Sequence, residues 1–244
     1  MNDPQVIYGT RAIMETINSG KECEKILLQR DLRNPLTSEL LTLAENFKIP
    51  VLIVPVEKLN RVTRKNHQGA IAYISPIQYS SVEHMVSTAY ERGELPFVLI
   101  LDRITDVRNF GAIARTAECA GVHGIIIPSR GSALITSDAV KTSAGALNFI
   151  PVARCENLKT EIKSLQENGI YVVACTEKTE DSLFSLDLNR PVALIVGAEE
   201  DGISSAYLDI ADAKGKLPMT GNIGSLNVSV ATGVAIYEAQ RQRL

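Results

Sequence analysis

From residue 82 onward, short apolar runs alternate with amphipathic stretches, and this alternation limits the possible folds more than any other feature of the sequence. Strand-sized apolar runs lie at residues 97–101, 124–127, 171–175 and 192–196. Segments of helical period begin at residue 82, span residues 109–120, 137–147 and 158–168, and close the chain. Strands that alternate with helices form a mostly parallel sheet with helices on both faces. We therefore predict an α/β fold in which ligands bind beyond the carboxyl ends of the strands.

A second, smaller α/β pattern occupies the first 75 residues. Helices are expected from Thr10 and near residues 36–47, and strands at residues 25–28, 51–54 and 70–75. The following stretch, SPIQYSSV, places proline and serines between periodic segments and indicates a linker. The predicted domains are residues 1–78 and residues 79–244.

The composition suits a soluble protein with a substantial core, because 45% of the 244 residues are hydrophobic and 22% are charged. The longest apolar runs are of strand length, and the N-terminus has no basic region followed by an apolar signal core. We therefore expect a cytoplasmic protein without membrane segments. Four scattered cysteines without a C-x-x-C pair, and three histidines without acidic neighbours at ligand spacing, predict neither a disulfide nor a metal site.

The formal net charge of −3 argues weakly against binding to nucleic acid, which requires clustered Lys and Arg. The distribution of charge softens this argument, because residues 1–80 contain ten Lys and Arg against eight Asp and Glu. Arg61, Arg64, Lys65 and His67 are candidate contacts to a phosphate backbone. The alternative is that this charged run is simply a solvated face.

Three segments with glycines and small polar residues lie at the ends of predicted strands. They are DRITDVRNFGAIARTAECAG at residues 102–121, LIVGAEEDGIS at residues 194–204 and LPMTGNIGSLNVSVATGV at residues 217–234. Because ligands of parallel sheets bind beyond the carboxyl ends of the strands, the three segments can converge on one site. The G-x-G-x-x-G and phosphate-loop patterns are both absent from the sequence, which argues against a standard dinucleotide or NTP site.

In the third segment, a glycine turn runs directly into an apolar helical stretch. Gly221 and Gly224 would permit a positive φ or a close approach of the backbone to a ligand. Ser225 is a candidate cap for the helix whose buried face begins at Leu226 and Val228. Such a turn can enclose a small ligand, but it is also an ordinary connection in α/β proteins.

Together, the three segments resemble the motifs of the SpoU/TrmH family of RNA ribose 2′-O-methyltransferases. The matching positions are Asn109, Gly111, Arg115, Thr116, Ala117, Gly197, Glu199, Pro218, Met219, Gly221, Ser225, Leu226, Asn227 and Ser229. Residues 7–13 and 66–72, IYGTRAI and NHQGAIA, resemble the small accessory RNA-binding domain of the ribosomal-RNA members, and KTSAGAL at residues 141–147 resembles a small-residue helix of the family. The resemblance therefore covers nearly the whole chain.

The resemblance implies S-adenosylmethionine as the cofactor, RNA as the substrate, a homodimer and a deep trefoil knot at the C-terminus. It implies cofactor contacts at Gly197, Leu217, Met219, Gly221 and Leu226. It implies catalytic positions at Asn109, Arg115, Glu199, Ser225 and Asn227. Each of these polar residues has a structural alternative, as a helix cap or an exposed charge.

Arg115 is expected to act through its charge. Methyl transfer to a hydroxyl depends chiefly on positioning, and a guanidinium keeps its proton up to a pH above about 12. We therefore expect Arg115 to bind the phosphate beside the target ribose and to stabilise the developing alkoxide, with base behaviour after desolvation as the alternative.

Large-subunit (23S) ribosomal RNA is the expected substrate, and transfer RNA is the alternative. Val107, Glu200 and Gly224 stand where the family usually has other residues, which also leaves open a non-catalytic RNA-binding or ribosome-assembly protein on the same fold. A small-molecule enzyme that uses another nucleotide is a further alternative.

Overall fold

The structure, a computed structural model, describes residues 6–244. The chain forms two compact units that divide between Gln78 and Tyr79, and the first unit also includes Leu134–Ser137. Within residues 6–244, no helix combines the length and apolar character that crossing a membrane requires.

The first unit is built on a mixed four-stranded sheet in the order β1-β4-β2-β3. Its strands are β1 (Val6–Tyr8), β2 (Cys23–Gln29), β3 (Val51–Val54) and β4 (Ala70–Ile74). Strand β4 runs antiparallel to β1 and β2, whereas β2 and β3 are parallel. Its helices are α1 (Thr10–Asn18), α2 (Pro35–Asn46) and the short α3 (Val56–Val62).

The two faces of this sheet are covered unequally. Ile13 of α1 and Leu40 of α2 pack with Ile26 in the main core on one face. Leu59 of α3 packs with Leu27 in a much smaller cluster on the other face. The division follows from the alternation of side chains along β2, since neighbouring residues of a strand point to opposite faces.

The second unit is built on a six-stranded sheet in the order β10-β8-β9-β5-β6-β7. All of its strand pairs are parallel. Its strands are β5 (Phe97–Asp102), β6 (Gly124–Pro128), β7 (Val152–Cys155), β8 (Tyr171–Cys175), β9 (Val192–Gly197) and β10 (Ala213–Gly215). Every residue of the central strand β5 is buried, as expected for a parallel sheet covered on both faces.

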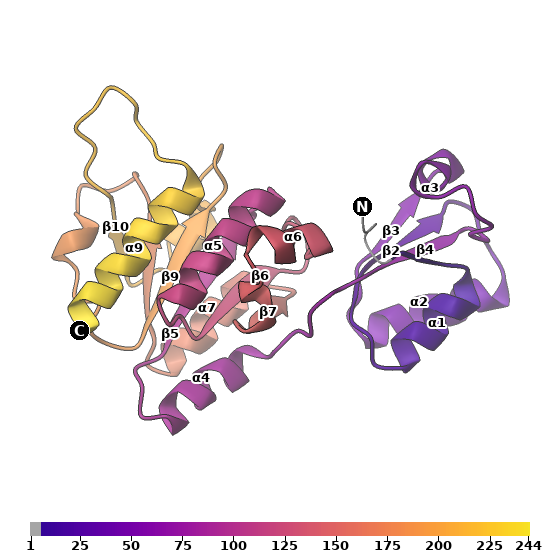
Figure 1. The fold of residues 1–244 in the computed structure, drawn as a ribbon, viewed down its shortest axis with the longest axis horizontal. Coiled ribbons are helices and arrows are strands. Elements are labelled where there is room, and N and C mark those ends of the chain that lie inside the picture. The colour runs from indigo at the N-terminus through magenta and orange to yellow at the C-terminus, as the bar shows by residue number, and fades with distance from the viewer. Residues whose placement is uncertain (1–5) are drawn as a thin grey trace. The chain divides into compact units, whose positions relative to one another are not determined.

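Helices cover both faces of the second sheet, which confirms the predicted α/β architecture. Figure 1 shows α5 and α9 side by side along the sheet, and these two helices contact each other. Side chains of α4, α7 and α8 share a core cluster with strand residues on the other face. The helices are α4 (Val82–Glu91), α5 (Val107–Cys119), α6 (Ser137–Thr142), α7 (Leu158–Glu167), α8 (Ser205–Leu208) and α9 (Val228–Arg243).

The helix predicted at residues 137–147 is broken. Helix α6 ends at Thr142, and a separate 3-10 turn covers Ala146–Asn148. Ala144 and Gly145 both adopt positive φ, at 52° and 89°, which a right-handed helix does not permit. The short elements β1, α3, β7, α8 and β10 were not predicted, because three to seven residues carry too little periodicity to be recognised.

Candidate active site

The first two motif segments begin at neighbouring strand ends. Strands β5 and β9 are paired along their full length, and Asp102 at the end of β5 lies opposite Gly197 at the end of β9. The third segment follows β10 and leads into α9. The parallel register therefore delivers segments that are far apart in the sequence to one edge of the sheet.

Asn227 joins all three segments through its side chain. Its amide nitrogen donates to Oδ1 of Asn109 at 3.0 Å and to Oε1 of Glu199 at 2.7 Å. Its Oδ1 accepts from the backbone N–H groups of Ser229 and Val230, at 3.0 and 3.4 Å, and so caps α9. The predicted cap at Ser225 is therefore replaced by Asn227, two residues later.

Asn109 is free for this contact because another residue caps its own helix. Asp106 is the N-cap of α5, and its Oδ1 accepts from the backbone N–H groups of Arg108 and Asn109, at 2.7 and 2.9 Å. Within residues 6–244, the side-chain N–H groups of Asn109 and Oε2 of Glu199 have no hydrogen-bond partner. Both groups are available to a ligand.

A first cleft of about 350 Å³ lies between the end of the sheet and the loop before α9. Gly197, Leu217, Met219, Ser225 and Leu226 line it, together with Glu199, whereas Gly221 does not. Apolar side chains and backbone edges therefore form much of its wall, which is typical of small-molecule sites.

The structure gives a reason for glycine at position 197 but not the predicted one at positions 221 and 224. Gly221 and Gly224 do not adopt positive φ, and a Cβ at either position would meet no atom within 4 Å. At Gly197, in contrast, a Cβ would lie 2.2 Å from the carbonyl carbon of Gly202. Glycine at position 197 is thus required by the approach of the protein's own loop.

A second cleft of about 300 Å³ adjoins the first. Its lining includes Arg103, Asp106 and Asn109. Ala198, Glu199, Glu200 and Val228 line both clefts and form their common wall. A group bound in one cleft therefore lies next to a group bound in the other, with the carboxylate of Glu199 between them.

Sequence reasoning missed Arg103, the cation in the second cleft. Its guanidinium forms two hydrogen bonds with the buried Asp102, at 2.9 and 3.1 Å, and further bonds with Asp201 and the carbonyl of Gly202. The hydrogen bond with Asp102 raises the pKa of Arg103. Asp102 also accepts from the backbone N–H of Ser204 at 2.8 Å. These contacts hold the loop after β9 against the end of β5. The sequence signal that could have identified Arg103 is an Asp-Arg pair at the end of a buried strand.

Comparison with known proteins identifies the family. Residues 96–237 match the SpoU rRNA Methylase family, and residues 6–80 match a domain described as RNA 2′-O ribose methyltransferase substrate binding. The chain belongs to the SpoU/TrmH family of RNA methyltransferases. The resemblance seen in the motifs is thereby confirmed.

Curated relatives match this SpoU methyltransferase over nearly its whole length. A Bacillus subtilis protein named YacO, assigned by name to the TrmH family of tRNA/rRNA methyltransferases, is 35% identical over 237 residues, which are 97% of this chain and 95% of the relative. A Staphylococcus saprophyticus protein of the same designation is 37% identical over 238 residues, covering 98% and 96%. The structure of an AdoMet-bound rRNA methyltransferase from Sinorhizobium meliloti aligns with a TM-score of 0.61 at 25% identity, covering 98% of this chain and 87% of that one.

The structure does not place Arg115 in either cleft of this methyltransferase. Arg115 is exposed on α5, and its side chain has no hydrogen bond or ion pair within residues 6–244. It lies seven residues after the exposed Arg108, so both guanidinium groups project from the same face of the helix, about 10 Å apart along its axis. Within a single chain, Arg115 therefore does not line the first cleft, beside which it was expected.

The charged run in the first unit of the methyltransferase is only partly on the surface. Arg61, Arg64 and Lys65 are exposed. His67 is buried, with Nε2 at 3.0 Å from Oδ1 of Asn60 and Nδ1 accepting from the backbone N–H of Gly69 at 3.0 Å. His67 thus supports the loop before β4 and leaves three cations of this run for a partner.

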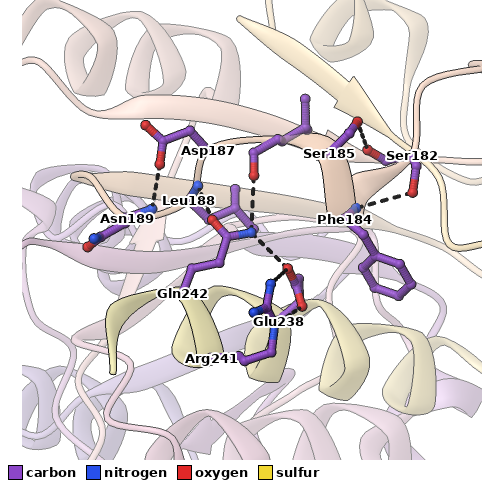
Figure 2. Close-up of polar contacts among 10 residues, drawn as sticks. Ser182, Phe184, Ser185, Asp187, Leu188, Asn189, Glu238, Arg241 and Gln242 are labelled. Carbon is purple, nitrogen blue, oxygen red and sulfur yellow. Dashed lines mark hydrogen bonds and ion pairs between the residues drawn. The ribbon is translucent and has the colours of Figure 1, made fainter.

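Side-chain hydrogen bonds also hold the C-terminal end of α9. Figure 2 shows Gln242 reaching the segment before β9: its Oε1 accepts from the N–H of Leu188 at 2.8 Å, and its Nε2 donates to the carbonyl of Leu186 at 3.1 Å. Arg243 donates to four backbone carbonyls, those of Leu95, Pro96, Leu188 and Arg190. The helix that carries Asn227 is therefore fixed along its axis.

Cys175 lines the first cleft of the methyltransferase. Burial raises the pKa of its thiol to about 12, so the thiol is protonated at neutral pH and offers an uncharged, polarisable surface.

Within residues 6–244, no group of His, Cys, Asp and Glu side chains is arranged to hold a metal ion.

Proposed function

We propose that this protein transfers a methyl group from S-adenosylmethionine to a ribose 2′-hydroxyl of RNA. The observation that carries the proposal is the common wall of the two clefts, where Asn227 holds Glu199 and Asn109 in place. A cofactor in the first cleft and a nucleotide in the second would meet at this wall. The description of the matched N-terminal domain supports ribose methylation, and the AdoMet bound to the Sinorhizobium meliloti enzyme supports the cofactor.

The residues of the first cleft fit this cofactor. Leu217, Met219 and Leu226 provide apolar contacts for the adenine, and the carboxylates of Glu199 and Glu200 complement a positive sulfonium. When bound, S-adenosylmethionine supplies an electrophilic methyl group. The cleft volume of about 350 Å³ lies within the range typical of small-molecule sites.

In the second cleft, the chain positions the ribose. Oε2 of Glu199 would accept the hydrogen bond from the 2′-hydroxyl and then its proton as the methyl group is transferred, and the unpartnered N–H groups of Asn109 would donate to the neighbouring phosphate. Asn227 sets the relative position of these two side chains, and Ser225 borders the cofactor side. Holding the reacting atoms in attack geometry contributes about 7–11 kcal/mol in favourable cases, more than a single proton transfer provides.

Arg115 binds RNA outside the clefts in this proposal. Together with Arg108 it presents two exposed guanidinium groups along α5, and Asn109 of the second cleft lies between them in the sequence. A guanidinium keeps its proton at neutral pH, so Arg115 clamps a phosphate near the target ribose and thereby helps to place the nucleotide in the second cleft.

The proposal extends to domains and assembly. Residues 1–78 form the RNA-binding domain and residues 79–244 the catalytic domain, which acts in the cytoplasm. Val230, Val234 and Tyr237 are exposed at helical spacing on α9, and this apolar stripe supports a homodimer. The trefoil knot stays a prediction from the resemblance.

Large-subunit (23S) ribosomal RNA is the substrate that we propose, with transfer RNA as the alternative, since the curated relatives are named for both. The test supplies purified protein with methyl-labelled cofactor and either unmodified 23S ribosomal RNA or transfer RNA, and then maps the labelled ribose. Label on a ribose of one RNA identifies the substrate. If the protein binds RNA but neither binds the cofactor nor transfers its labelled methyl group, it is a non-catalytic RNA-binding protein instead.

A further inference from the structure

The two faces of the sheet in the first unit differ in how much helix covers them. Helices α1 and α2 cover the main core face, whereas among residues 6–78 the opposite face carries only the seven-residue helix α3 (Figure 1). Tyr8, Lys25 and Tyr73 lie on this opposite face and are only partly buried, and Lys58 and Arg61 come from α3. The face of the sheet that carries α3 therefore combines aromatic rings with cations.

Each of the two aromatic rings has a lysine ammonium over its face. Lys25 of β2 lies directly opposite Tyr73 of β4, and its Nζ is 4.9 Å from the centre of that ring. Tyr8 of β1 lies opposite Ile71, two residues before Tyr73 on the same face, and Nζ of Lys65 is 5.5 Å from the Tyr8 ring. Two ring–lysine pairs thus lie on adjacent strands of one surface.

The electrostatic balance at this surface favours an anion. Residues 51–70 contain four Lys and Arg and a single acidic residue, Glu57, although the whole chain is net negative. Lys58 and Arg61 border a hollow of about 610 Å³ on the surface of α3. The pKa of Lys25 is lowered by burial and by the nearby charge of Lys58, and Glu24 opposes this only in part. A bound polyanion would relieve the repulsion between the two lysines.

We propose that this surface is a binding platform for single-stranded RNA, on which Lys25 and Lys65 move from the rings to phosphates while bases stack against Tyr8 and Tyr73. The aromatic–lysine face consists of Tyr8, Lys25, Lys58, Arg61, Lys65 and Tyr73. Stacking on aromatic rings within a cationic groove is the general means by which proteins hold single strands. The proposal rests on the proposed function and adds where the RNA is held and in which form.

Single-stranded RNA is favoured over a duplex by the geometry of the face. Bases in a duplex are stacked on one another and offer no free face to a tyrosine, whereas unpaired bases can lie on both rings. The cations contribute an attraction that does not depend on the RNA sequence. The logarithm of the association constant falls linearly with the logarithm of the salt concentration, with a slope of about −0.7 for each phosphate neutralised on a single strand.

The test measures binding of a fluorescently labelled single-stranded 12-mer RNA, and of the matching duplex, to the full-length protein. Tyr73→Leu should weaken binding of the single strand about tenfold, because a stacked base is lost, whereas Tyr73→Phe should bind as the unmodified protein does. Lys25→Met should reduce the salt slope by about 0.7. Lys159→Met, at an exposed lysine of α7, serves as the matched control and should change neither quantity.

The proposal is overturned if Tyr73→Leu and Lys25→Met bind the single strand like the unmodified protein, or if the duplex binds as tightly as the single strand. Thermal unfolding of each variant shows whether it folds, and Lys25→Met decides the question if Tyr73→Leu does not fold. Failure of the proposed function gives a different result: the platform then binds RNA, but no methyl group is transferred from labelled cofactor to any RNA.

Discussion

Asn227 donates its side-chain amide to Oε1 of Glu199 at 2.7 Å, while the Oδ1 of the same side chain caps α9. The two functions of this residue can be separated by substitution. Asn227→Asp keeps a capping oxygen but replaces the donor by a second carboxylate beside Glu199, so methyl transfer should fall while stability changes little. Asn227→Ala loses the cap as well and should also lower the free energy of unfolding by about 1 kcal/mol. Urea denaturation measures the effect on stability, and transfer of a labelled methyl group measures the effect on activity. If Asn227→Asp were as active as the unmodified enzyme, the hydrogen bond from Asn227 to Glu199 would have no part in methyl transfer.

Removal of the charge of Glu199 tests its contact with the ribose hydroxyl. Glu199→Gln retains an oxygen for Asn227 but weakens acceptance from the hydroxyl, and kcat should fall about 100-fold. Glu200→Gln is the matched control, because Glu200 also lines both clefts but forms no hydrogen bond with Asn227 within the described residues. Single-turnover methyl transfer compares the two variants, and similar losses in both would assign the effect to charge alone.

Arg115 should matter for turnover and not for the cofactor. Arg115→Ala should abolish methyl transfer, because the phosphate clamp that places the nucleotide is lost, and Arg115→Lys should restore part of the activity. Cofactor affinity, measured by isothermal titration, should be unchanged, since Arg115 does not line the first cleft. Strong residual methylation by Arg115→Ala would refute the catalytic role.

The anchor at the C-terminal end of α9 should contribute measurably to stability. Arg243→Ala removes donors to four backbone carbonyls and the contact with the Phe97 ring, and should lower the free energy of unfolding by about 2–3 kcal/mol. Arg241→Ala is the control, because among residues 6–244 the exposed guanidinium of Arg241 pairs only with Glu238, within one helix turn, and should contribute less than the contacts of Arg243 do. Urea midpoints compare the two variants, and equal losses would mean that the carbonyl contacts add nothing.

Thiol reactivity should distinguish the cysteines by pH. The pKa of Cys155 and Cys175 is raised to about 12 by burial, so their reactive thiolates become populated only as the pH approaches that value. Cys119 is exposed and should be alkylated first at pH 8. Mass spectrometry after timed alkylation measures the three rates, and equal labelling of Cys119 and Cys175 at pH 8 would contradict the assignment.

The architecture of this protein could be predicted from the sequence because its signals are local. The buried strands β5 and β9 are continuous apolar runs, and the long helix α9 follows a glycine-rich turn. Three ordered motifs also place Asn109, Glu199 and Asn227 in one family pattern on the sequence alone. Short elements such as β10 were missed, because three residues contain no usable period.

Tertiary structure alone decided which of these residues touch and which face a ligand. The sequence does not show that Asn227 caps α9 and at the same time holds Glu199, or that Gly197 is required by the approach of Gly202. Nor does it show that His67 is buried while Arg103 lines a cleft. The physical reason is that periodicity and capping depend on neighbours in the chain, whereas hydrogen bonds between distant segments depend on the register in which parallel strands align their ends.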